Sequence, residues 1–129
     1  MLVDTAGLLC FFDRDNEHHV DAIQLLEDAT VRVIHSYVLV EFVALCHARR
    51  LNRAGALALT AECMDNPAIE CVWVDEFLHR DAQTLLESRT DKNYSLCDAV
   101  SFLLMQRRGL NDALTTDHHF EQEGFVKLL

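Results

Sequence analysis

The chain has little proline and little glycine, with one Pro and four Gly among its 129 residues. Collagen-like and low-complexity chains are rich in these residues, and disordered chains are poor in apolar ones, whereas half of this sequence is hydrophobic. The composition therefore excludes all three classes. A chain of this length can bury one core and is too short for two, so we expect a single compact domain over residues 1–129.

The sequence also lacks long apolar runs and paired cysteines. No run approaches the ~18 residues of a membrane span, and the first residues do not form a secretory signal with a basic leader and a small-residue cleavage site. The cysteines are odd in number and form no C-x-x-C pair of the kind that marks zinc or redox chemistry. They are Cys10, Cys46, Cys63, Cys71 and Cys97. The pattern predicts buried free thiols in a cytoplasmic protein that does not associate with membranes.

Basic residues are scarce, since 11 Lys and Arg face 21 Asp and Glu and give a net charge of −10. This balance argues against a broad basic surface for nucleic acid, so RNA binding would be local and mediated by metal. The acidity could equally suit a basic partner protein. Arg49, Arg50 and Arg53 form a small basic cluster, which is typical of a solvated helix face and could also contact RNA phosphates.

Short apolar runs alternate with segments of helical periodicity. Strands are predicted at 2–3, 31–34, 69–74, 113–116 and 125–128, and helices at 5–9, 20–29, 36–50, 51–64, 75–88 and 95–108. Ser36 is expected to cap the helix that it begins. Because parallel strands need crossover connections, this order predicts an α/β fold with a parallel sheet of four or five strands and helices on both faces.

Four acids lie where an apolar run ends or within the first turns of a predicted helix: Asp4, Glu41, Asp98 and Asp117. In an α/β domain these positions share one rim of the sheet, where such folds bind ligands. Converging carboxylates repel one another unless a cation neutralises them, and a hard divalent ion prefers oxygen ligands. The sequence therefore predicts a metal site at this rim.

Each acid also has a simpler interpretation. Asp4 and Asp117 could be helix caps, and Asp98 follows Ser95 by three residues, which matches a capping box. Glu41 lies among apolar neighbours, so it is expected to be partly buried and to need a cation, unless it faces solvent near a helix N-terminus. Four acids at four separate junctions favour a shared site over four unrelated caps.

Four stretches resemble the successive motifs of PIN-domain ribonucleases, in particular the VapC-like toxins of bacterial toxin–antitoxin pairs. They are Leu-Val-Asp-Thr from residue 2, Val-Leu-Val-Glu-Phe from 38, Tyr-Ser-Leu-Cys-Asp-Ala-Val-Ser-Phe from 94, and Ala-Leu-Thr-Thr-Asp-His-His-Phe from 113, followed by Gly124-Phe125. Each motif is weak alone, but the ordered set spans essentially the whole chain.

This resemblance implies a PIN-like three-layer α/β/α sandwich and a ribonuclease activity that depends on Mg²⁺ or Mn²⁺. The motif acids that hold the metal fall on Asp4, Glu41, Asp98 and Asp117, and the supporting hydroxyls on Thr5, Ser95 and Thr116. The resemblance also implies a homodimer and a cognate antitoxin whose basic arm enters the acidic pocket. Cys97, beside Asp98, departs from the family pattern. Asp91 and Glu121 could be outer ligands, although ordinary loop acids are the simpler interpretation.

The same residues also allow other functions. His18-His19 and His118-His119 could bind a metal, but they lack zinc spacing, so solvent-exposed histidines are expected. A phosphatase using Asp4 as nucleophile would need a second acid where this chain has Ala6. A non-catalytic PIN-like module that binds RNA or protein remains the alternative to a nuclease.

Overall fold

The computed structural model describes all residues, 1–129, and contains one five-stranded sheet. The strand order is β3-β2-β1-β4-β5, and every neighbouring pair is parallel. The strands are β1 (Leu2–Val3), β2 (Val33–His35), β3 (Glu70–Val72), β4 (Asp112–Leu114) and β5 (Val126–Lys127). The predicted parallel sheet is therefore confirmed, at the upper end of the expected strand number.

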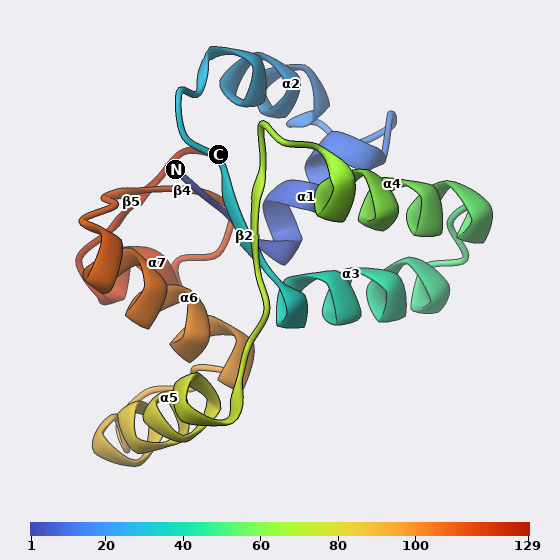
Figure 1. Cartoon of the computed structure of the whole chain (residues 1–129). Helices are drawn as coiled ribbons and strands as arrows, with labels where there is room; N and C mark the ends of the chain where they lie inside the picture. The colour runs from blue at the N-terminus through green and yellow to red at the C-terminus, as the bar shows by residue number, and fades with distance from the viewer.

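Helices cover both faces of this sheet, which gives three layers (Figure 1). One layer holds α1 (Thr5–Phe12), α2 (His19–Asp28), α3 (Ser36–Ala48) and α4 (Arg53–Asp65). The other holds α5 (Glu76–Ser88), α6 (Leu96–Arg108) and the short α7 (His119–Gln122). This is the three-layer α/β/α arrangement that the resemblance to PIN domains implies.

Consecutive strand residues belong to two separate cores. Leu2, Val33 and Ala113 pack with α5, α6 and α7, whereas Val3, Ile34 and Leu114 pack with α1, α3 and α4. Successive side chains of a strand point to opposite faces, so a two- or three-residue apolar strand serves both cores at once. This explains why consecutive residues of the central strands, such as Leu2 and Val3, Val33 and Ile34, and Ala113 and Leu114, are all apolar.

A glycine brings the first helix close to the sheet. A Cβ atom added at Gly7 of α1 would lie 2.0 Å from the carbonyl oxygen of Leu114, the last residue of β4. Only a residue without a side chain allows this approach. The amide of Asp4 also donates to the same Leu114 oxygen over 3.2 Å. The ends of β1 and β4 are thereby held together, and so are the residues that follow them.

The predicted cap at Ser36 is wrong. Strand pairing continues to His35, which faces Val72 in the register of β2 and β3, so Ser36 is the first residue of α3 and not its cap. His35 occupies the cap position without a side-chain cap bond, and the Ser36 hydroxyl instead accepts a hydrogen bond from the amide of Val74. Parallel pairing thus extends β2 to His35, one residue beyond the apolar run, and α3 begins directly after it.

Two of the other boundary differences have local reasons. Arg50 adopts a left-handed conformation with φ of 57°, and the side chain of Asn52 accepts from the amide of Gly55, so α4 begins at Arg53 and not at 51. The strand predicted at 113–116 ends at Leu114, because the Thr115 side chain turns into the site described below.

All five cysteines are free thiols, and only Cys71 is not fully buried. This agrees with the thiols expected from the sequence. None of the helices combines the length and the apolar character needed to span a bilayer.

Candidate active site

The four predicted acids line one pocket at the carboxyl ends of the central strands. The pocket has a volume of about 300 Å³, and its walls include Asp4, Glu41, Asp98 and Asp117, together with the predicted hydroxyl residues Thr5 and Thr116. The third predicted hydroxyl residue, Ser95, is not part of its lining. The exposed acids Asp91 and Glu121 also lie outside it.

Asp4 is the deepest of these carboxylates and is only 5% exposed. It follows β1 and caps α1, and its Oδ2 atom accepts hydrogen bonds from the amide of Ala6 at 3.4 Å and the hydroxyl of Thr115 at 2.8 Å. Burial raises the pKa of Asp4 to about 6; the nearby charge of Asp98 adds to this, and the Thr115 hydrogen bond opposes it. No cationic side chain pairs with this buried carboxylate, so binding of a cation would stabilise its charged form.

The hydroxyl that contacts Asp4 belongs to Thr115, which sequence reasoning missed in favour of its neighbour. Thr115 is fully buried, donates to Asp4 and accepts from the amide of Asp117 at 3.0 Å. Thr116 is exposed and lines the pocket without contacting Asp4. The Thr115 hydroxyl therefore links two of the acids, and nothing in two adjacent threonines distinguishes which one turns inward.

Asp98 is both a helix cap and a pocket residue. Its Oδ2 atom accepts from the amide of Ser95 at 2.9 Å, and its amide donates to the Ser95 hydroxyl at 3.0 Å, which completes the capping box. The carboxylate is 7% exposed and lies at the N-terminus of α6, where the helix dipole favours negative charge. Ser95 acts here by orienting Asp98 from outside the pocket.

Glu41 is exposed, which corrects the expectation that it would be partly buried. On α3, Val38, Leu39 and Phe42 enter the core, while Val40 and Glu41 face outward because each helical residue is rotated by about 100° from the last. The adjacent thiol of Cys97 has its pKa raised, first by burial and then by the charge of Glu41, so it stays protonated beside the acids.

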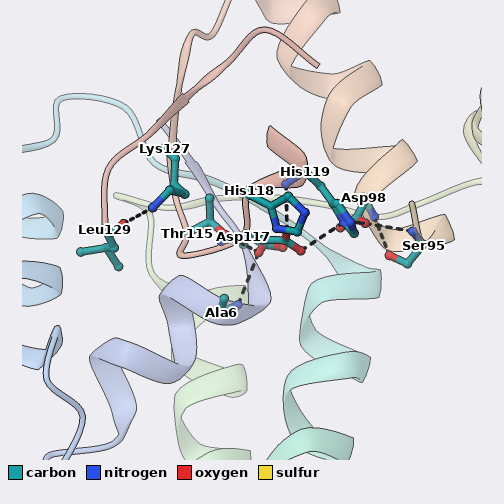
Figure 2. A network of polar contacts seen from close by, with 10 residues as sticks. Ala6, Ser95, Asp98, Thr115, Asp117, His118, His119, Lys127 and Leu129 are labelled. Atoms are coloured by element: carbon teal, nitrogen blue, oxygen red, sulfur yellow. Dashed lines mark hydrogen bonds and ion pairs between the residues drawn. The ribbon is translucent and has the colours of Figure 1, made fainter. Parts of the chain in front are cut away.

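His119 joins two of the acids and is not the solvent-exposed residue that we expected. Its Nδ1 atom lies 3.1 Å from Asp98 Oδ2 and 3.4 Å from Asp117 Oδ2, and its side chain is only 19% exposed (Figure 2). The edge of its ring packs against Tyr94 with the ring centroids 5.2 Å apart. His118 is 69% exposed, as expected, and lies 3.6 Å from Asp117. The sequence signal for this role was that His119 lies two residues after Asp117.

The pocket offers two kinds of ligand to a metal. Carboxylate oxygens dominate it, which suits Mg²⁺ or Mn²⁺, and Asp117, His118 and His119 can also present donor atoms within 4.8 Å of one another. The hydroxyl oxygen of Thr5, next to Asp4, is buried without a hydrogen-bond partner. A polar atom in that state normally has a partner, so this oxygen and the buried Asp4 carboxylate both fit a bound cation with its water.

Comparison with known proteins agrees with this geometry. The family pattern described as the PIN domain matches residues 1–125. Over 129 residues the chain is 28% identical to the "23S rRNA-specific endonuclease VapC20" of two Mycobacterium tuberculosis strains, covering 99% of this chain and 97% of the relative.

The solved crystal structure of M. tuberculosis VapC20, described as a toxin that cleaves the sarcin–ricin loop, superimposes with a TM-score of 0.88 at 27% identity. The superposition covers 98% of this chain and 96% of that one. Since the family pattern matches residues 1–125 and the superposition covers 98% of the chain, this protein belongs to the PIN-domain family.

Proposed function

We propose that the chain is a metal-dependent endoribonuclease and the toxin of a toxin–antitoxin pair. The observation that carries this proposal is the convergence of Asp4, Glu41, Asp98 and Asp117 on one pocket, with Asp4 buried and without a cationic side chain to neutralise it. The likeness to VapC20, which is named as an rRNA endonuclease, supports the same reaction class.

In this proposal Asp4, Asp98 and Asp117 hold Mg²⁺ or Mn²⁺, and Glu41 is a further ligand or acts through water. When bound, such a cation supplies a Lewis acid that lowers the pKa of water and neutralises phosphate oxygens during hydrolysis of the phosphodiester bond. The chain's own groups prepare the site: Thr115 favours the ionised form of Asp4, and the Ser95 amide fixes Asp98.

His119 completes this preparation by lying between the carboxylates of Asp98 and Asp117, which come from separate elements. Outer groups that orient the ligands of a metal commonly set its affinity. We therefore assign His119 a positioning role. The alternative is direct ligation, since donor atoms of Asp117, His118 and His119 lie within 4.8 Å of one another.

The substrate class that we propose is structured RNA, and ribosomal RNA is the first to test because the named relative cleaves 23S rRNA. The proposed inhibitor is an antitoxin with a basic segment, which suits an acidic pocket in a cytoplasmic chain of net charge −10. We also propose a homodimer, because Val40, Met64 and Trp73 are 70%, 43% and 67% exposed and line one common depression that a second copy could cover.

The test compares the parent chain with Asp98→Asn and with Asp91→Asn, a matched change at an exposed loop acid. In millimolar Mg²⁺ or Mn²⁺ the parent and Asp91→Asn should cleave ribosomal RNA and gain thermal stability from the metal. Asp98→Asn should lose both effects while keeping its circular dichroism spectrum. Cleavage by Asp98→Asn at the parent rate would remove the site assignment, and metal-independent RNA binding by a parent that never cleaves would favour a non-catalytic module.

A further inference from the structure

The acidic pocket continues as a groove along α3. Glu41, Leu45 and Arg49 all line it, and their spacing of four residues places them on one face of the helix. Eight residues of α-helix span about 12 Å, so the groove extends well beyond a single carboxylate cluster. Its opposite wall is formed by Leu9 and Cys10 of α1. One end of the groove is therefore acidic, and the other carries a guanidinium group.

Arg49 is one of a few basic residues that have no partner inside the molecule. Five basic side chains are held in ion pairs by carboxylates, namely Arg80, Arg89, Lys92, Arg107 and Arg108. Two more, Arg32 and Lys127, donate to backbone carbonyls. The four without an ion pair or a side-chain hydrogen bond are Arg14, Arg49, Arg50 and Arg53.

These four unpaired arginines lie at one end of the molecule. Arg49, Arg50 and Arg53 surround the connection from α3 to α4, and Arg14 follows α1 in a depression that it shares with Gly55 of α4. In a chain with a net charge of −10, the uncompensated positive charge is thus concentrated where the groove leaves the acidic pocket.

Arg49 lines the same pocket as Leu9 and Cys10 of α1. Burial raises the pKa of the Cys10 thiol, and the positive charge of Arg49 is the main influence opposing that shift. Asp13, whose charge also acts on Cys10, makes no ion pair with Arg49. Glu17 lines this end of the groove, but its side chain is 88% exposed and approaches only His18, at 3.7 Å. A charge so exposed to water neutralises Arg49 little.

We infer that Arg49 binds a backbone phosphate of the RNA strand, next to the phosphate that is hydrolysed at the four acids. The inference rests on the proposed function and names the substrate contact of the same site. Carboxylates alone repel a polyanion, so a strand that reaches them needs a cation close by, and the planar fork of arginine matches a phosphate group. Arg14, Arg50 and Arg53 extend the positive region beyond the groove and attract the strand without fixing it.

Steady-state cleavage tests the role of Arg49 with three variants. Arg49→Gln removes the charge, Arg49→Lys keeps it, and Arg80→Gln removes a charge of equal size from α5, where Arg80 pairs with Glu76 on the surface. With a labelled ribosomal RNA fragment as substrate, Arg49→Gln should raise KM about tenfold and leave kcat nearly unchanged, because it alters binding and not the reacting phosphate. Arg49→Lys should restore most of the affinity, and Arg80→Gln should match the parent.

Binding measured without cleavage separates this inference from the proposed function. In an Asp98→Asn background, fluorescence anisotropy with a fluorescein-labelled single-stranded RNA should show a log–log salt dependence that becomes shallower by about 0.7 when Arg49 is changed to Gln. If the parent cleaves RNA but Arg49→Gln alters neither KM nor this slope, the inference is overturned while the nuclease stands. If RNA binding depends on Arg49 but no cleavage occurs with Mg²⁺ or Mn²⁺, the nuclease fails and the phosphate contact stands.

A third outcome addresses a different partner. If Arg49→Gln leaves RNA binding intact but abolishes binding of an acidic peptide such as oligoglutamate, the groove receives protein at this end, and the inference is overturned.

Discussion

Thr115 and Asp4 are 111 residues apart in the sequence, yet the hydroxyl of Thr115 donates a 2.8 Å hydrogen bond to Oδ2 of Asp4 inside the pocket. The bond favours the ionised form of Asp4, whose pKa burial has already raised to about 6. Replacing Thr115 by Val keeps the shape and removes the donor, so the pKa of Asp4 should rise further. At pH 7 less of the carboxylate would be ionised, and the affinity for Mn²⁺ measured by calorimetry should fall about tenfold or more.

The same substitution should lower the free energy of unfolding in urea by about 2 kcal/mol, because a buried hydrogen bond to a charged group is lost. Thr115→Ser keeps the hydroxyl and should retain most of the metal affinity. Thr116→Val, at the adjacent exposed position, is the matched control, and its affinity for Mn²⁺ should be closer to that of the parent than the affinity of Thr115→Val is. Equal losses in the two valine variants would contradict the assignment of the inward hydroxyl to Thr115.

The sequence alone predicts the layered fold because its signals are local and repeated. Apolar runs of strand length alternate with helical periodicity, and the acids follow those runs, so the shared rim can be inferred before any contact is known. The identity of the hydroxyl at Asp4 could not be inferred, because it depends on how the ends of β1 and β4 meet: the Asp4 amide donates to the Leu114 carbonyl, and Gly7 of α1 lies against the same oxygen. That close approach is a tertiary event with no local signature.

Local sequence patterns also failed to predict which side chains of the site are exposed. Glu41 has apolar neighbours in sequence but lies on the outer face of α3, and His119 appears polar and exposed in sequence but is held between two acids. The groove is different, because the spacing of Glu41, Leu45 and Arg49 is present in the sequence. That these three residues line one groove can be inferred only once the structure shows that this face of α3 borders the acids.

The buried state of Asp4 predicts a pH dependence of stability in the metal-free protein. Its pKa is about 6 in the folded protein and 3.8 when exposed, so the folded state binds the proton more tightly. The corresponding stability is fully present below pH 3.8 and is lost as the pH rises through 6, a change of about 3 kcal/mol. In EDTA, Asp4→Asn should therefore become more stable than the parent as the pH rises over this window, measured as the difference in the free energy of unfolding.

The difference between the two proteins is the informative quantity, since His35 has the opposite effect. Burial lowers the pKa of His35 to about 4, so its contribution is lost as the pH falls from 6.5 toward 4 and would mask that of Asp4 if the parent were measured alone. Adding Mg²⁺ at pH 7.5 should stabilise the parent and leave Asp4→Asn unchanged. A pH-independent difference would contradict the raised pKa of Asp4, and equal stabilisation of both proteins by Mg²⁺ would show that Asp4 is not a ligand.

The ring of His119 lies between two carboxylates that come from different parts of the chain. Nδ1 is 3.1 Å from Asp98 and 3.4 Å from Asp117, and the backbone amide of His119 separately donates to Asp117 Oδ1 at 2.9 Å. His119→Ala removes the ring but keeps that amide bond, so the fold of the turn should survive while the two acids lose their common contact. The affinity for Mn²⁺ should fall about tenfold, as is usual when a group that orients metal ligands is removed.

His118→Ala is the matched control for this change, because the ring of His118 is 69% exposed and lies 3.6 Å from Asp117 alone. It should reduce Mn²⁺ affinity much less than His119→Ala. Calorimetry of both variants at pH 7.5 distinguishes three arrangements. A loss confined to His119→Ala supports positioning of the acids, equal losses would indicate that both rings ligate the ion with Asp117, and tighter binding by His119→Ala would mean that the ring competes with the cation for Asp98. Only the first result agrees with a histidine that holds the two acids in place for a metal.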